Sequence, residues 1–279
     1  MNKKLIAAAV ASAIAAPGIV SVASADVSVY GTMYVRATLQ DSKMGLENGS
    51  MSRFGFKSST DLGNGNTVSG GIEVGFDATD GQVNSGVTGR LGHITYAGDW
   101  GSLRLGSAWS VMGTAQGHAC PNVGQACGGS VNYQSRVADA IVVKTAVGGL
   151  DLNAQAEFDG GTDLAGWAVS TGIDVGSISL GIGHRDYDTG DVNTVGASAT
   201  IAGVGIGGVV SSNSDDQVGW ALSANVSGLS LTLDENASDA QEVTANYKVD
   251  LGGGSSMTFG VVDADGSGAK VLAQWAYGL

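Results

Sequence analysis

The residues that could perform catalysis or hold a metal ion are few and scattered along this 279-residue chain. Its three histidines, His93, His118 and His184, have no carboxylate or cysteine partner at metal-ligand spacing. The glycine-rich run 203–208 lacks the Lys-Ser/Thr pair and the helix of a phosphate-binding loop, so it reads better as a strand of small residues. We therefore expect no enzyme, no metal site and no cofactor.

The two cysteines, Cys120 and Cys127, are separated by six residues. They are too few for a zinc site. Pro121 and Gly124 favour a turn between them, which lets the two Cα atoms approach the ~5.5 Å of a disulfide. We expect a Cys120–Cys127 disulfide if the chain is exported, and the alternative is a pair of free thiols.

Basic residues are the remaining chemical feature, and they alternate with apolar residues. Arg36 shares a face with Tyr34, Arg53 shares one with Lys57, and other basic residues alternate in the same way with apolar neighbours. The full set of such residues is Arg36, Arg53, Lys57, Arg104, Arg136 and Lys144. A charge at mid-membrane on a lipid-facing strand costs about 2–4 kcal/mol, so in a membrane these side chains must point into water. The alternative for each is a solvated position at a rim.

The elements that carry these residues have period two. Residues 27–39, 68–76 and 178–182, for example, alternate apolar with small or polar side chains. A strand sends successive side chains to opposite faces, so each segment has one oily and one polar face. Clusters rich in Gly, Asn and Asp separate the segments. Strands are predicted at 27–39, 51–60, 66–77, 87–97, 101–109, 135–146, 150–158, 164–173, 177–185, 192–200, 204–211, 217–226, 229–235, 242–249, 254–263 and 267–279.

The composition indicates where the oily faces lie. Glycine supplies 46 residues, only 14% of residues are charged, and the net charge is −13. The negative charge disfavours nucleic-acid binding. A soluble sandwich or secreted β-solenoid also fits the alternation, but it would carry more charge on its outer faces. A closed barrel with lipid outside and water inside fits better, and Trp275 and Tyr277 on one face of the last strand are typical of its aromatic girdle.

The N-terminus predicts export. Lys3 and Lys4 precede the apolar stretch Leu5–Val20, and Ala23-Ser24-Ala25 fits a small-x-small cleavage site. The alternative is a membrane anchor, which is disfavoured because polar residues follow soon after the apolar stretch. We expect residues 1–25 to be a signal peptide and 26–279 the mature chain, which keeps 11 basic and 26 acidic residues, a net charge of −15.

Four motifs, in order, resemble the general porins of Gram-negative outer membranes. They are DVSVYG at 26–31, SRFGFK at 52–57 with DLGNG at 61–65, RLGHITY at 90–96 with GDWG at 98–101, and RVADAI at 136–141. Beyond residue 150 only the strand rhythm supports the comparison. The sequence departs from the family at Leu279, where Phe is usual, and at Ser107, where Arg is common.

The resemblance implies a transmembrane antiparallel β-barrel of about 16 strands, a homotrimer, and a constriction loop at 110–132 folded inward. The family's loop normally carries acids, whereas here Ser110–Asn132 has none and His118 is its one titratable group besides the cysteines. We count His118 among the constriction residues. The resemblance also implies that the second- and fifth-strand neighbourhood forms a basic wall across from this loop.

The predicted function is a water-filled channel in the outer membrane for passive diffusion of small hydrophilic solutes and ions, in contact with outer-membrane lipid. The alternatives are a substrate-selective channel and a non-conducting structural or receptor barrel.

The acids fall mostly in predicted loops, such as Asp186, Asp188 and Asp191. Charges more than a Debye length of ~8 Å from the ion path are largely screened, so we expect weak anion preference or near-neutrality.

Overall fold

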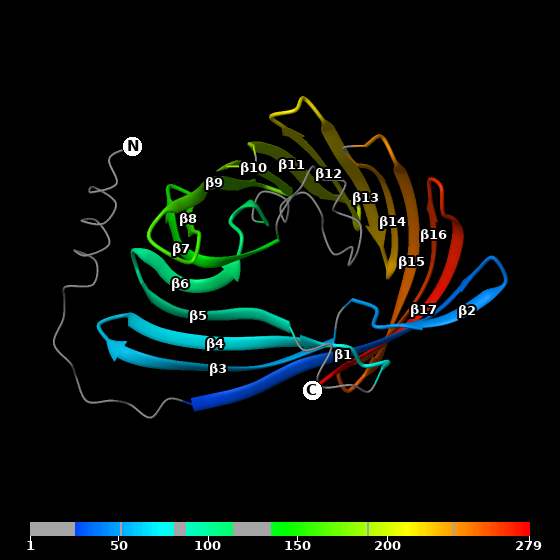
Figure 1. The fold of residues 1–279 in the computed structure, drawn as a ribbon, viewed down its shortest axis with the longest axis horizontal. Coiled ribbons are helices and arrows are strands. Elements are labelled where there is room, and N and C mark those ends of the chain that lie inside the picture. The colour runs from blue at the N-terminus through cyan, green and yellow to red at the C-terminus, as the bar shows by residue number, and fades with distance from the viewer. Residues whose placement is uncertain (1–25, 51, 81–87, 114–134, 189, 237) are drawn as a thin grey trace.

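The computed structural model describes residues 26–50, 52–80, 88–113, 135–188, 190–236 and 238–279. Among these residues the strands join into one antiparallel sheet (Figure 1). The strands are β1 Asp26–Gln40, β2 Lys43–Glu47, β3 Ser52–Gly63, β4 Asn66–Phe76, β5 Thr88–Gly98, β6 Gly101–Trp109, β7 Arg136–Val147, β8 Leu150–Phe158, β9 Leu164–Val175, β10 Ile178–Tyr187, β11 Val192–Ile201, β12 Val204–Asn213, β13 Val218–Val226, β14 Leu229–Glu235, β15 Gln241–Gly252, β16 Ser255–Ala264 and β17 Gly268–Gly278. No helix among the described residues is long and apolar enough to cross a membrane.

The sheet closes on itself through β1. Residues Thr32–Leu39 of β1 pair with β17, so the last strand closes the barrel against the first. On its other side, β1 pairs with β3 through Asp26–Thr32 and with β2 through Arg36–Gln40. Because β2 and β3 run in the same direction along one side of β1, they are two pieces of one interrupted strand. The barrel is therefore all-β, closed, antiparallel and sixteen strands around, as the sequence predicted.

The two ends of the barrel differ in the length of their connections. Seven two-residue turns join strands at the end that also holds Asp26 and Leu279: 64–65, 99–100, 148–149, 176–177, 202–203, 227–228 and 253–254. At the first of these turns Gly63, Asn64 and Gly65 have φ values of 81°, 54° and 75°, which glycine and asparagine tolerate best. The other end carries the longer connections, including 77–87 and 110–135.

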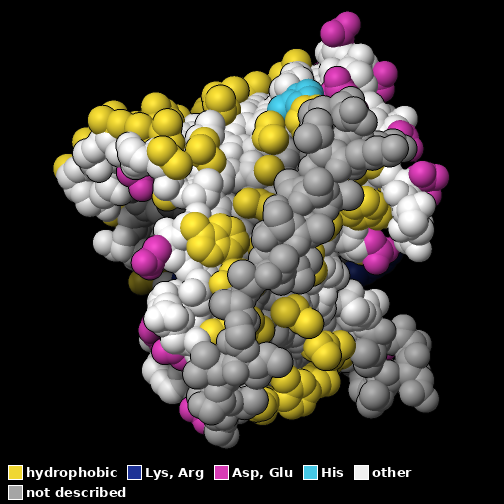
Figure 2. Space-filling model, turned by 90° about the vertical axis from the view of Figure 1, so that its left-hand side faces the viewer, with side chains coloured by type: hydrophobic (Ala, Val, Ile, Leu, Met, Phe, Trp, Pro, Cys, Tyr) yellow, Lys and Arg dark blue, Asp and Glu magenta, His cyan; other side chains and the backbone are white. Residues whose placement is uncertain are grey.

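The outer face of the barrel is apolar. Side chains such as Val27 on β1, Phe56 on β3, Ile72 on β4 and Leu180 on β10 point outward and are exposed in the isolated chain. Figure 2 shows hydrophobic side chains gathered over one outer side, with acidic side chains toward its margins. This distribution inverts that of a soluble protein and is the one expected when lipid surrounds the sheet.

Tryptophans on the outer face have partners for their indole N–H groups. Trp167 donates to Asp186 Oδ2 at 3.0 Å, Trp220 to Glu235 Oε1 at 3.1 Å, and Trp275 to Ser255 Oγ at 2.7 Å. Trp275 and its neighbour Tyr277 lie exposed near the turn end, on the face predicted for a girdle. An apolar ring body with a satisfied polar tip suits the membrane interface.

Candidate functional site

The inward face of β3–β5 holds a charged cluster centred on Glu73. The register aligns Gly55 with Glu73 and Arg53 with Gly75, so these residues share the lumen face. Glu73 is only 5% exposed. Its Oε1 accepts from Arg90 Nε at 2.6 Å, and its Oε2 lies 3.8 Å from Arg53 Nε. One carboxylate thus fixes two guanidinium groups, with the short Arg90 contact being the stronger charge-assisted bond.

Aromatic rings support the cations of this wall. The Arg53 guanidinium lies 5.7 Å from the ring centroid of Tyr34, and the Lys57 ammonium lies 5.5 Å from that of Tyr30. Tyr30 also interacts electrostatically with Glu73. The Tyr30 ring can lie there because Gly55 has no Cβ, which would come within 2.7 Å of Tyr30 Cζ. Cation–π contact holds these side chains while leaving part of each cation in water.

The basic surface continues along β6 and β7. Arg104 Nε donates to Thr95 Oγ1 at 2.9 Å, and both side chains share the lumen face. Lys144 lies opposite Ser102 and Asn153 on that face. Arg136, the first residue of β7, has its guanidinium 5.7 Å from the Trp109 ring and interacts electrostatically with Glu73. Wall cations therefore extend from β3 to β7 around one strongly bound acid.

Residues Ser110–Gly113, which follow β6, turn into the barrel. The Val111 N–H donates to Gln155 Oε1 at 3.0 Å, and Ser170 Oγ donates to the Val111 carbonyl at 2.8 Å. Gln155 and Ser170 are lumen-facing residues of β8 and β9. His118, Cys120 and Cys127, which the sequence assigned to this loop, lie outside the described residues.

An apolar patch lies under this segment on the inner wall. Val111 and Met112 are almost fully buried against inward-facing residues of β7, β9 and β11, together with Ala108 and Val137. The remaining members of the patch are Ala140, Val142, Ala168 and Val192. Sequence reasoning assigned apolar side chains to the outer face and missed this patch, although Ala140–Val143 is apolar at four successive positions. Burial of Val111 and Met112 here stabilises the inward path of the segment.

A second charged cluster supports the same segment, and sequence reasoning did not single it out. Glu157, 1% exposed, accepts from Gln155 Nε2 at 2.6 Å and from Tyr187 Oη at 2.7 Å, and it lies 3.4 Å from Arg185 Nη2. The Arg185 guanidinium lies 4.1 Å from the Tyr187 ring centroid. The inward position of Glu157 and Arg185 in the alternation is the signal that would have found them.

The first strand contributes Arg36, which makes contacts of its own with β17 and β2. Arg36 donates to Gln274 Oε1 through Nε at 3.2 Å and Nη2 at 2.8 Å, and its Nη1 lies 3.7 Å from Glu47. The sequence analysis counted Arg36 among the pore-lining basic residues, and in the structure its contacts are to Gln274 of β17 and Glu47 of β2. The described residues contain no group of three or more His, Asp or Glu side chains that could hold a metal ion.

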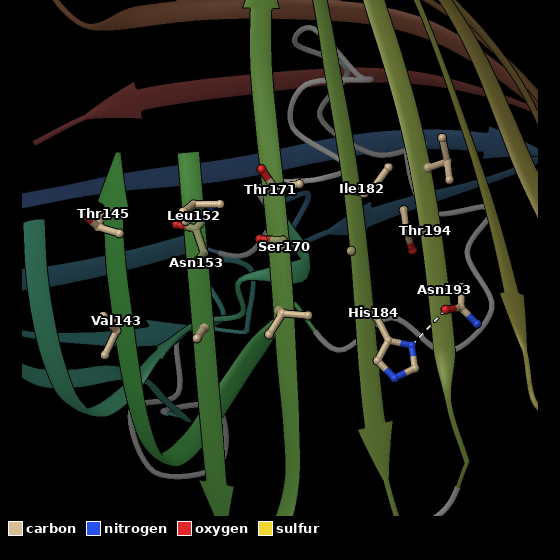
Figure 3. Close-up of a pocket in the computed structure, with 14 residues that line it drawn as sticks. Val143, Thr145, Leu152, Asn153, Ser170, Thr171, Ile182, His184, Asn193 and Thr194 are labelled. Carbon is tan, nitrogen blue, oxygen red and sulfur yellow. Dashed lines mark hydrogen bonds between the residues drawn. The ribbon is translucent and has the colours of Figure 1, made fainter. Parts of the chain in front are cut away.

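The outer face over β7–β11 has a groove of about 610 Å³, shown in Figure 3. Val143, Leu152 and Ile182 line it from neighbouring strands. His184 lies there too, with Nδ1 2.8 Å from Asn193 Oδ1 and its ring 5.1 Å from that of Trp167. His184 is therefore an outer-face residue and takes no part in the lumen.

These features define a class: a closed outer-membrane β-barrel whose charged lumen is entered by the segment that follows β6. The chain belongs to the Gram-negative porin family, whose model matches residues 7–278. It is an outer-membrane protein that forms a water-filled channel for passive diffusion. None of the curated proteins matches the chain.

Solved porins share its fold at low sequence identity. OmpF of Salmonella typhi in complex with daunomycin has a TM-score of 0.74 at 14% identity, covering 91% of this chain and 97% of that one. An anion-selective porin from Comamonas acidovorans has 0.68 at 17%, covering 92% and 100%. A loop-deletion mutant of OmpT, an outer membrane protein of Vibrio cholerae, has 0.71 at 12%, also covering 92% and 100%.

Proposed function

We propose that this porin is a general diffusion pore with weak anion preference or near-neutral selectivity, set by Arg36, Arg53, Lys57, Arg104, Arg136, Lys144 and His118. The observation that carries the proposal is the excess of positive over negative side chains on the lumen wall of β3–β7. Arg53, Arg90 and Arg136 interact with the single buried carboxylate of Glu73, so the wall keeps a net positive charge. Charges at a constriction outweigh more numerous charges in wider, screened water.

The net negative charge of the whole chain does not contradict this selectivity. Many of the acids lie at the loop end, where bulk water screens them. Asp77 is one example: hydrogen bonds from Thr79 Oγ1 at 2.6 Å and Thr79 N–H at 2.8 Å lower the pKa of Asp77 below its ordinary value. Asp77 is thus ionised at neutral pH, but it lies beyond the end of β4. One structural neighbour is described as anion-selective, and this chain's basic wall is compatible with the same preference.

The reversal potential in a salt gradient tests the proposal. The wild type is compared in planar bilayers with the double variant Arg53→Ala/Lys57→Ala. We expect the wild type near neutral or weakly anion-selective, and the variant shifted toward cations. A strongly cation-selective wild type that the double substitution leaves unchanged would contradict the basic-wall assignment. Absence of any conductance would contradict the pore itself.

The proposal also covers export and assembly. Residues 1–25 act as a cleaved signal peptide, residues 26–279 form the barrel, and residues 110–132 form the constriction loop with a Cys120–Cys127 disulfide. The mature chains assemble as a homotrimer, and outer-membrane lipid covers the remaining outer face. The exposed apolar side chains of β1–β5, such as Val27, Phe56 and Ile72, support such contacts. One neighbour, OmpT of Vibrio cholerae, is described in a trimer form.

Three measurements test these points. Mass spectrometry of mature protein should give an N-terminus at Asp26. Under non-reducing conditions the same spectra should show Cys120 and Cys127 bridged, and two free thiols would reject the disulfide. Chemical cross-linking in detergent should end at a trimer band, and a ladder ending at a monomer would reject the trimer.

A further inference from the structure

A polar pocket lies on the lumen wall where β14–β17 meet β1, and its lining residue Tyr34 also contacts Arg53 of the Glu73 cluster. Its volume is about 210 Å³. Strand register aligns Arg36 with Gln274, Gln274 with Thr258, and Thr258 with Lys248, so one row of side chains crosses four strands. The pocket's hydroxyl and amide groups come from Tyr34, Ser50, Ser230, Asn246, Ser256 and Thr258.

At one end of the pocket lies Arg36, a cation whose side chain is already ordered before any solute binds. Arg36 is 8% exposed, and two of its N–H groups are held by Gln274 Oε1 at 3.2 and 2.8 Å. Since the Gln274 oxygen is occupied, what Gln274 can offer a solute is its NH₂ group. A side chain ordered before binding costs less entropy when the ligand arrives.

The break between β2 and β3 forms one side of the pocket. Asn48 Oδ1 accepts from the Ser52 N–H at 3.1 Å and from Ser52 Oγ at 2.7 Å, which fixes this turn. Ser50 Oγ then lies 3.5 Å from Gln274 Oε1. Gly49 packs directly on Gln274, where a Cβ would come within 2.3 Å of Oε1. The interruption of the second strand thus gives the pocket a wall that an unbroken strand would not supply.

The other end of the pocket is a cation with room to move. Lys248 is exposed to the lumen, and among the described residues it has no ion pair within 4 Å. Two acids lie near the pocket: Glu47 is 3.7 Å from both Arg36 and Lys270, and Asp250 Oδ1 accepts from the Gly252 N–H at 2.9 Å. The three cations Arg36, Lys248 and Lys270 outnumber the two acids Glu47 and Asp250, so the pocket region has a net positive charge.

We propose that this pocket transiently binds small hydroxylated carboxylates as they cross the pore, an inference that rests on the proposed diffusion function. The two cations attract the carboxylate groups, and the serine and threonine hydroxyls pair with the solute's own hydroxyls. At ~30 Å³ per water the pocket holds about seven waters, and it is smaller than the ~300–1,000 Å³ of drug-sized sites. The fitting solutes are therefore short hydroxy acids.

Block of chloride current by L-malate tests the proposal. Malate is added to bilayers held at constant KCl and constant ionic strength, and glycerol serves as an uncharged hydroxylated control. We expect malate to lower the wild-type conductance to a plateau, whereas glycerol has no saturable effect. Lys248→Gln should raise the half-blocking concentration of malate roughly tenfold, as expected when a charged hydrogen-bond donor is lost.

Lys43→Gln is the matched control, because it makes the same change of charge at the start of β2, outside the pocket. We expect Lys43→Gln to block like the wild type. Equal malate block in Lys248→Gln and the wild type, or an equal shift in both lysine variants, would overturn the pocket assignment. A channel that conducts KCl but shows no malate plateau would overturn this inference and leave the diffusion pore intact, whereas no KCl conductance would overturn the diffusion pore.

Discussion

The two halves of the lumen wall carry different types of inward-facing side chain. The half formed by β3–β7 carries long cations, and each of Arg53, Lys57, Arg104 and Arg136 has an acid, an aromatic ring or a hydroxyl against it. The half formed by β11–β13 carries small residues instead. The inward faces there are Thr194, Gly196 and Ser198 on β11, Gly207, Val209 and Ser211 on β12, and Gly219, Ala221 and Ser223 on β13.

The comparison shows how a closed sheet makes a channel asymmetric. Both halves have the same strand alternation and the same apolar outer face, so the difference arises only from the inward residues. Long charged side chains narrow the lumen and set its field on one side. Small hydroxyl residues leave the other side open, and they pair with one another, as Thr194 Oγ1 does with Ser211 Oγ at 3.0 Å.

Among substitutions that test this comparison, we expect the largest loss of folding stability at Glu73. Glu73→Gln removes the buried carboxylate of the charged half that pairs with the guanidinium groups of Arg90 and Arg53. Breaking a buried ion pair in this way destabilises by about 3–5 kcal/mol. Urea unfolding in lipid vesicles, followed by tryptophan fluorescence, measures the loss.

Glu47→Gln is the matched control for that substitution. Its side chain is 42% exposed, and its contacts to Arg36 and Lys270 are both 3.7 Å. Exposed pairs contribute about 0–1 kcal/mol, so this variant should unfold almost like the wild type. Equal losses in the two variants would mean that Glu73 is no more than a solvated wall residue.

Much of the fold could be predicted because alternation is a local signal. Closing the barrel requires only that each strand have one apolar face, and the sequence carries that pattern from Val27 to Leu279. The hairpin piece β2 was missed because it is five residues long and follows a two-residue turn at Asp41 and Ser42, which have φ values of 50° and 63°. A strand this short contains too few apolar–polar alternations to be recognised from the sequence.

The site was less predictable, because its geometry depends on cross-strand register. The alternation gave Arg53 and Lys57 a common face, and the structure agrees. It could not show that Arg90 reaches Glu73, since a register irregularity between Glu73 and Val74 brings them together. Nor could it show that Arg36 bonds Gln274, 238 residues away along the chain.

The second prediction concerns the segment that enters the lumen, at the border between the halves. Gln155→Leu removes the acceptor of the buried Val111 N–H and the donor to Glu157. An unsatisfied buried group costs about 1–3 kcal/mol. We expect a loss of stability in that range in urea unfolding, together with noisier open-channel current, because Ser110–Gly113 loses one of its anchors.

Asn153→Leu is a control on the same strand and the same face. Asn153 is buried, and its Nδ2 has no hydrogen-bond partner among the described residues. Replacing an unsatisfied amide with a residue of similar size should change stability little or increase it. If Asn153→Leu destabilised as much as Gln155→Leu, the effect would reflect the wall in general and not the anchor.

The smallest effect is expected in the open half, at the Thr194–Ser211 pair. Both hydroxyls are almost fully buried, so Thr194→Val or Ser211→Ala alone leaves one without its partner and should cost about 1 kcal/mol. The double variant removes both hydroxyls and should cost less than the sum of the singles, with a coupling energy of about 0.5–1 kcal/mol in a double-mutant cycle of urea unfolding. Because no charge changes, the reversal potential should stay at its wild-type value in all three variants, in contrast to Arg53→Ala/Lys57→Ala. Additive losses would show that the two hydroxyls act independently, and a shifted reversal potential would show that the open half also contributes to selectivity.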